Sequence, residues 1–268
     1  IYIDGMDPLH MDELAETIVR ENGKPLAEAR GEVTYAAEFF RWFAEEAVRL
    51  HGSVVGAPAG GGTQVVLNQP VGVAYLITPW NFPAAMLTRK IGPALAAGCT
   101  VLAKPASLTP LTAVAIVDVL RQILSDAGAP PDVVNLVASR DSKGVTAAVL
   151  GDDRVRKLSF TGSTEVGRIL LAQAAERVVN SSMELGGNAP FLVFADADID
   201  AAVEGALLAK LRHNGETCTA ANRFFVEAPV ADEFARKLAA AMADLRVGPG
   251  LDPDTQVGPL VDDDTRDK

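Results

Sequence analysis

The run Thr100-Val101-Leu102-Ala103-Lys104 decides the fold class, because it is short and apolar and is followed by apolar residues at helical spacing over residues 111–127. Such a run is typical of a strand that is buried on both faces of a sheet. The same alternation continues outward in both directions. Further strands are expected at 133–137 and 157–161, and further helices at 84–97, 143–150 and 165–175. The pattern predicts an α/β fold with a doubly wound, Rossmann-like parallel sheet.

Other elements are expected on both sides of this core. Two amphipathic helices at 11–21 and 32–50 come first, followed by a glycine-rich linker at 56–62 and by extended segments at 63–68 and 71–78. A second, incomplete α/β unit should follow, with strands at 191–194 and 224–226 and helices at 199–211 and 230–245. We therefore divide the chain into N-terminal helices at 1–62, an arm at 63–75, a main domain at 76–183 and the start of a second domain at 184–268.

Composition excludes several classes of partner. The 268 residues carry a formal net charge of −11, which would repel nucleic acid and anionic membrane surfaces at long range. No uninterrupted apolar run reaches the length of a membrane helix. Two cysteines are too few for a disulfide framework. We expect a cytoplasmic protein that binds neither nucleic acid nor membrane and holds no metal.

Two stretches of small residues carry a thiol and a carboxylate. Cys218 lies in Asn214-Gly215-Glu216-Thr217-Cys218-Thr219-Ala220-Ala221-Asn222-Arg223, and Glu184 lies in Met183-Glu184-Leu185-Gly186-Gly187-Asn188-Ala189-Pro190. Small side chains let a backbone approach a ligand closely, so Cys218 is a candidate nucleophile and Glu184 a candidate general base. On composition alone, a buried inert cysteine and a solvated strand-end glutamate are the alternatives. Cys99 fits only the inert interpretation.

These stretches, together with Pro79-Trp80-Asn81-Phe82-Pro83, resemble the aldehyde dehydrogenase superfamily in motif and in order. The resemblance implies the fold of that family. It also implies that Cys218 attacks the aldehyde, that Glu184 activates water, and that the Asn81 side chain and the Cys218 backbone N–H stabilise the oxyanion. Considered alone, Asn81 would more often be a turn former before Phe82-Pro83.

A dinucleotide site is expected at the carboxyl ends of the strands. Lys104 ends one strand, and residues 160–167 lead from another strand into a helix whose free N–H groups suit a pyrophosphate. The alternatives are a surface lysine and a chance glycine spacing. The resemblance implies a cofactor site made of Trp80, Asn81, Lys104, Pro105, Ala106, Ser107, Gly162, Ser163, Gly167 and Leu185.

Ser107 indicates which dinucleotide is preferred. Family members that prefer NAD commonly carry a glutamate at this position, whose carboxylate binds the ribose hydroxyls and repels a 2′-phosphate. Here a neutral hydroxyl lies three residues after the positive Lys104. We therefore expect NADP as the cofactor, with NAD still able to bind.

The substrate is expected to carry a carboxylate. Within the superfamily the chain most resembles succinate-semialdehyde dehydrogenases, through residues 24–32, 88–90, 92–99 and 221–223. That resemblance implies that Arg89 and Arg212 bind the distal carboxylate of the substrate, whose geometry a guanidinium fork suits. A surface arginine with an i,i+4 partner is the alternative for each. Glutarate semialdehyde and apolar aldehydes stay open as other substrates.

The resemblance covers only the middle of a full-length family member, so we expect this chain to be a segment of a longer enzyme. The rival hypothesis is a truncated, non-catalytic homologue that only binds nucleotide or a partner chain. The arm at 63–75 resembles the segment that family members add to the sheet of a neighbouring subunit. We therefore expect a homodimer or homotetramer.

Overall fold

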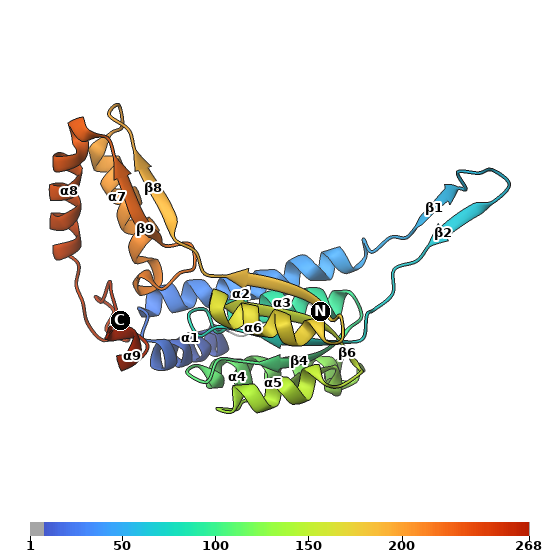
Figure 1. Ribbon diagram of the computed structural model, residues 1–268. Helices are drawn as coiled ribbons and strands as arrows, with labels where there is room; N and C mark the ends of the chain where they lie inside the picture. Colours follow the sequence, from blue (N-terminus) through green and yellow to red (C-terminus); the bar gives the residue numbers. More distant parts are fainter. Residues whose placement is uncertain (1–7, 268) are drawn as a thin grey trace.

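The computed structural model describes residues 8–267, and its main feature is a five-stranded parallel sheet (Figure 1). The strand order is β5-β4-β3-β6-β7. The chain adds β4 and β5 on one side of β3 and then returns to add β6 and β7 on the other side. This reversal confirms the predicted doubly wound fold. The strands are β3 Val73–Ile77, β4 Thr100–Lys104, β5 Val134–Leu136, β6 Val155–Gly162 and β7 Asn180–Leu185.

Helices cover both faces of this sheet. Successive side chains of β3 point to opposite faces, so Ala74 and Leu76 enter one core and Tyr75 enters the other. The first core is covered by α1 to α4, and the second by α5 and α6. These elements are α1 Pro8–Asn22, α2 Leu26–Ala47, α3 Ala85–Ala96, α4 Pro110–Asp126, α5 Ser142–Leu150 and α6 Thr164–Ala175, with the 3-10 helix η1 at Pro131–Val133.

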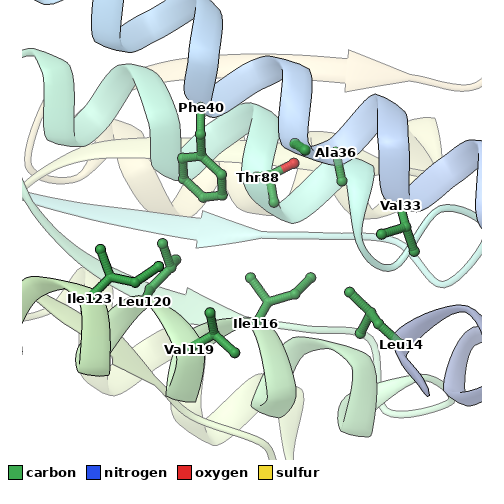
Figure 2. A pocket seen from close by; sticks show the side chains of 10 residues that line it. Leu14, Val33, Ala36, Phe40, Thr88, Ile116, Val119, Leu120 and Ile123 are labelled. Carbon is green, nitrogen blue, oxygen red and sulfur yellow. The ribbon is translucent and has the colours of Figure 1, made fainter. Parts of the chain in front are cut away.

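A small apolar cavity lies between α2 and α4. Val33 and Phe40 of α2 face Ile116 and Leu120 of α4 across an apolar cavity of only about 30 Å3 (Figure 2). α2 packs mainly on α1 and α3, and its buried residues belong to the first core, which holds the helix in place. None of the helices in residues 8–267 is long and apolar enough to cross a membrane.

A second, smaller unit follows β7. The strands β8 (Ala189–Val193) and β9 (Ala221–Val226) pair in parallel, and α7 (Ile199–Leu211) and α8 (Ala228–Ala243) pack against one face of them. This unit stands apart from the main sheet in Figure 1. The predicted start of a second α/β unit is therefore confirmed. The remaining elements are η2 Arg212–Gly215 and α9 Asp263–Arg266.

The arm differs from the prediction. β2 (Thr63–Val66) pairs antiparallel with β1 (Ser53–Gly56), so the glycine-rich residues 56–62 form a hairpin loop and not a linker. Segment 71–78 does not belong to the arm, because it contains β3 at the centre of the main sheet. The hairpin extends away from the rest of the chain (Figure 1). Both of its strands are exposed on both faces, so no burial pattern in the sequence indicated how they pair.

The boundary predicted at residue 184 is also displaced. Asn180–Leu185 forms β7 at the edge of the main sheet, where Glu184 lies opposite Thr161 of β6. The main domain therefore extends to Leu185. Sequence reasoning missed this strand because most of its residues are polar, and only every second one is partly buried. The other predicted helices and strands are present, although α2 begins earlier than expected.

Candidate active site

The carboxyl ends of β3, β6 and β7 meet around the point where the strand order reverses. In a doubly wound sheet, ligands bind in the crevice at this point. The segments that follow these strands line a cavity of about 440 Å3, together with the loop that carries Cys218. Asn81 follows β3, and Glu184 is the next-to-last residue of β7. The fold thus brings the three sequence motifs to one cavity.

Most of the predicted site residues line this cavity. They are Trp80, Asn81, Arg89, Gly162, Ser163, Glu184, Leu185, Arg212 and Cys218. The lining does not include Lys104, Pro105, Ala106, Ser107 and Gly167. Sequence reasoning missed Tyr35 and Glu216, which also line it. The position of Glu216 inside the cysteine motif could have indicated it, whereas Tyr35 lies on α2 and no sequence signal connects it to the site.

Cys218 is exposed and follows η2, a turn with unusual backbone geometry. His213 and Asn214 there have φ angles of 51° and 56°, in the left-handed region that non-glycine residues seldom occupy. The Glu28 carboxylate accepts a hydrogen bond from His213 N at 2.8 Å, and Asn214 Oδ1 accepts one from Gly258 N at 2.8 Å. The loop before the cysteine is therefore held by α2 and by the C-terminal segment.

His213 is a packing residue and not an acid or base. It is buried, and its ring lies 4.0 Å from that of Phe82, centroid to centroid. Burial lowers the pKa of His213 to about 3, and the nearby charges of Lys24 and Arg212 add to this effect. The imidazole is therefore neutral at physiological pH.

The Asn81 side chain contacts the cysteine loop directly. Its Nδ2 donates a hydrogen bond to the carbonyl oxygen of Glu216 at 2.7 Å. A side-chain amide has two N–H groups, so the second remains for a substrate oxygen. The contact fixes the separation between Asn81 and the loop that carries Cys218, as a preorganised oxyanion donor requires.

Glu184 has a buried lysine nearby. Lys90 of α3 is buried, and its Nζ donates to Ser159 Oγ at 2.8 Å. Burial lowers the pKa of Lys90 to about 8, and its attraction to Glu184 partly opposes that shift. A titratable cation therefore lies close enough to interact with the candidate base.

Glu216 titrates near neutral pH. Burial raises the pKa of Glu216 to about 7, and Asp262 adds to the rise, whereas a hydrogen bond from the Val261 backbone and the charge of Lys24 oppose it. Its Oε1 is buried without a hydrogen-bond partner among the described residues. At pH 7 the side chain is divided between its acid and carboxylate forms.

Two features near the sheet edge fit the anionic part of a dinucleotide. Lys104 is buried at the end of β4, and within residues 8–267 its Nζ makes one long hydrogen bond, 3.4 Å to Pro105 O. Ser163 is the N-cap of α6, and its Oγ accepts a hydrogen bond from Val166 N at 3.3 Å. An incompletely satisfied cation and the start of a helix both favour phosphate oxygens.

Side chains pack closely on two glycines in and after the turn from β6 into α6. A Cβ atom at Gly162 would lie 2.5 Å from the Phe160 ring, and one at Gly167 would lie 2.7 Å from the Leu185 side chain. The Leu185 side chain packs on Gly167 and therefore lies between this glycine and the cavity. This explains why Gly167 is near the site without lining it.

Arg89 and Arg212 both line the cavity and are exposed. The Arg89 guanidinium lies 5.9 Å from the Phe39 ring, and Arg212 is the first residue of η2. Ala85 and Pro93 lie four residues from Arg89 on α3, and the charge of Arg212 acts on the nearby Glu28 carboxylate. Both guanidinium groups are therefore placed to bind an anionic group in the cavity. Residues 8–267 contain no cluster of three or more His, Cys, Asp or Glu side chains that could hold a metal.

The chain matches the aldehyde dehydrogenase family over residues 8–268 and belongs to that family, which confirms the resemblance seen in its motifs. It is 55% identical to a succinate-semialdehyde dehydrogenase of Paenarthrobacter nicotinovorans, over 96% of this chain and 56% of the relative. It is 52% identical to a glutarate-semialdehyde dehydrogenase of Pseudomonas putida, over 94% of this chain and 52% of the relative.

Comparison with solved structures finds the same kind of relatives. A crystal structure described as an NADP-dependent enzyme of E. coli has a TM-score of 0.90 and 51% identity, over 96% of this chain and 52% of that one. A structure of succinate-semialdehyde dehydrogenase from Burkholderia pseudomallei has a TM-score of 0.90 and 50% identity, with the same coverage of 96% and 52%. The chain thus spans about half the length of the curated relatives it matches.

The substitution Glu216→Gln should weaken the pH dependence of stability. An acid whose folded-state pKa is raised stabilises the fold at low pH, and this contribution is lost as pH rises from 4.5, the ordinary pKa of a glutamate, to about 7. Glutamine does not titrate, so the melting temperature of the variant should fall less over this range than that of the wild type. Thermal unfolding at several pH values measures the difference. Glu204→Gln, at an exposed position of α7, is the matched control, and a Glu216→Gln curve parallel to that of the wild type would contradict the assignment.

Proposed function

We propose that the protein oxidises a short aldehyde with a distal carboxylate, such as succinic semialdehyde, to the corresponding acid with NAD(P)+. The observation that carries the proposal is the one cavity lined by Cys218, Glu184 and Asn81 together with Arg89 and Arg212. A thiol, a carboxylate and an amide supply a nucleophile, a base and an oxyanion donor. The relatives named as succinate- and glutarate-semialdehyde dehydrogenases support this substrate class.

The reaction begins when the Cys218 thiolate adds to the carbonyl carbon of the aldehyde. The second N–H of Asn81 Nδ2 and the Cys218 backbone N–H stabilise the charge that develops on the carbonyl oxygen. A bound nicotinamide dinucleotide would supply the hydride acceptor. The acyl group then remains on Cys218 Sγ as a thioester. Glu184 takes a proton from water, the hydroxide attacks the acyl carbon, and the acid is released as the Cys218 thiolate re-forms.

Arg89 and Arg212 would bind the distal carboxylate through charge-assisted hydrogen bonds. Because they line the same cavity as Cys218, a substrate held at its carboxylate end presents its aldehyde end to a confined space near the thiol. Glutarate semialdehyde is the second candidate, since one relative is named for it. An apolar aldehyde would gain nothing from the two arginines.

Removing either arginine should impair only substrates that carry a carboxylate. Arg89→Ala and Arg212→Ala should each lower kcat/KM for succinic semialdehyde by about 10- to 100-fold, because a hydrogen bond to a charged group contributes about 1.5–3 kcal/mol. For butanal, which lacks the carboxylate, kcat/KM should stay within about twofold. Nicotinamide absorbance follows both reactions, and Cys218→Ala is the inactive control. Equal losses with both aldehydes would contradict the carboxylate role, and full activity of Cys218→Ala would contradict the reaction itself.

For the cofactor we propose NADP in preference to NAD. Lys104 ends β4, and Ser107 lies in the exposed turn that follows, at the sheet edge where dinucleotides bind. A cation and a neutral hydroxyl suit a 2′-phosphate, whereas a carboxylate would repel it. A 51% identical relative from E. coli is named as NADP(+)-dependent, and another structural neighbour is described in complex with nicotinamide adenine dinucleotide. Pro105, Ala106, Trp80 and Leu185 would complete the site.

The substitution Ser107→Glu should shift the preference from NADP toward NAD. The new carboxylate would repel the 2′-phosphate and accept hydrogen bonds from the ribose hydroxyls of NAD, so the ratio of kcat/KM for NADP to that for NAD should fall by about tenfold or more. Ser107→Ala is the control, because it removes the hydroxyl without adding charge. A glutamate variant that keeps the wild-type ratio would show that residues other than Ser107 determine the preference for NADP over NAD.

We also propose that the protein is a cytoplasmic homodimer or homotetramer that assembles through the β1–β2 hairpin. Val54, Val55, Val65 and Val66 are exposed on it, and an isolated two-stranded hairpin has little stability of its own. Its open edges can extend the sheet of another subunit. Light scattering on the purified protein should give two or four chain masses, and Val54→Lys/Val65→Lys should lower the mass. A monomeric wild type would contradict the proposal.

A further inference from the structure

Lys24 and Glu32 form a buried ion pair that the proposed chemistry does not use. Both side chains are fully buried, and Lys24 Nζ lies 2.6 Å from Glu32 Oε2. Lys24 is in the turn between α1 and α2, and Glu32 is on α2. Neither residue lines the cavity of the candidate active site. A buried pair of this kind is weak evidence for a stabilising role, because the loss of hydration offsets much of the attraction between the charges.

The pair holds the segment that carries Asn81. Lys24 Nζ also donates a hydrogen bond to the backbone oxygen of Asn81 at 2.6 Å. Glu32 Oε1 accepts hydrogen bonds from Ala84 N at 2.8 Å and from Ala85 N at 3.1 Å, where α3 begins. The two charged groups therefore fix the backbone at Asn81 and just after it. With its backbone fixed, the Asn81 side chain has only two torsions left to set.

Helix α2 also holds the other half of the site. Glu28, one turn before Glu32, accepts the hydrogen bond from His213 N in the loop before Cys218. The Asn81 side chain in turn donates to the Glu216 carbonyl oxygen of the same loop. The segments that carry the amide and the thiol are thus both anchored to one helix, whose apolar face packs on α1 and α3.

We propose that Lys24 and Glu32 are positioning residues that set the Asn81 amide against Cys218, and so aim its free N–H at the oxygen of the reacting carbonyl. The proposal rests on the proposed function, since it gives Asn81 the role of oxyanion donor. A preorganised donor is effective because it needs no rearrangement when charge develops, and small displacements of such groups are costly. The buried pair supplies the backbone anchor that this requires.

The decisive variant is Lys24→Met/Glu32→Gln. The glutamine oxygen can still accept from Ala84 and Ala85, and methionine fills the volume of the lysine chain without leaving a lone buried charge. The ion pair is lost together with the anchor on the Asn81 backbone oxygen and the contact of Lys24 Nζ with the Phe82 ring, 4.6 Å from its centroid. We expect kcat for the aldehyde to fall by about 10- to 100-fold with KM changed by less than about threefold, because the free N–H would be misplaced mainly in the transition state.

Two further measurements separate positioning from general damage. Alkylation of Cys218 by iodoacetamide develops no carbonyl oxyanion, so its rate should match that of the wild type. In an Asn81→Ala background, where the amide is already absent, the double substitution should cost little more. Lys237→Met/Glu233→Gln is the matched control, because it makes the same changes in a surface pair on α8 and should leave kcat unchanged.

The outcomes are distinguishable. A folded Lys24→Met/Glu32→Gln variant with wild-type kcat, or losses that add fully to those of Asn81→Ala, would overturn the positioning role while leaving the proposed function intact. A parallel loss of Cys218 alkylation would overturn it too, because the whole site would then have collapsed. Wild-type kcat in Asn81→Ala would overturn the oxyanion role and with it the reason for the anchor.

Discussion

The reversal of strand order beside β3 determines where the polar groups of this protein can meet. All five strands of the main sheet are parallel, so their carboxyl ends share one edge. On that edge the segment after β3 delivers Asn81, the end of β6 leads to Ser163, and the end of β7 delivers Glu184. Cys218 comes from the second unit and completes the same cavity. The cavity therefore exists only when β7 and the second unit are both in place.

Polar contacts from α2 fix the positions of the Asn81 segment and of the loop before Cys218. Burying the charged groups that make these contacts costs free energy. Burial lowers the pKa of Lys24, and the charge and hydrogen bond of Glu32 oppose that change, so removing one partner alone would leave the other charge buried and unpaired. The left-handed backbone of His213 and Asn214 carries a further cost, which the hydrogen bonds from His213 N to Glu28 and from Gly258 N to Asn214 Oδ1 offset. Such features are typical of segments that are held for function.

Much of the fold could be predicted from the sequence because its strands and helices carry local signals. The strand at Thr100–Lys104 and the helix at Ile199–Leu211 occur at the predicted residues. The pairing of the hairpin could not be predicted, since strands exposed on both faces have no burial pattern. The strand β7 was missed for a different reason, because it lacks an apolar run. The motifs indicated Asn81, Glu184 and Cys218. Nothing in the sequence indicated that Lys24 would touch the backbone of Asn81, because that contact joins residues 57 positions apart.

The central claim is that Cys218 carries the acyl group of the substrate and that Glu184 is needed to release it. The most direct measurement is the intact mass of a Glu184→Gln variant after incubation with succinic semialdehyde and NADP, followed by peptide mapping. The account predicts that the protein gains the mass of one succinyl group, attached to Cys218, because the thioester forms but is hydrolysed slowly. An unmodified protein, or an adduct that is still formed when Cys218 is also replaced by alanine, would contradict it.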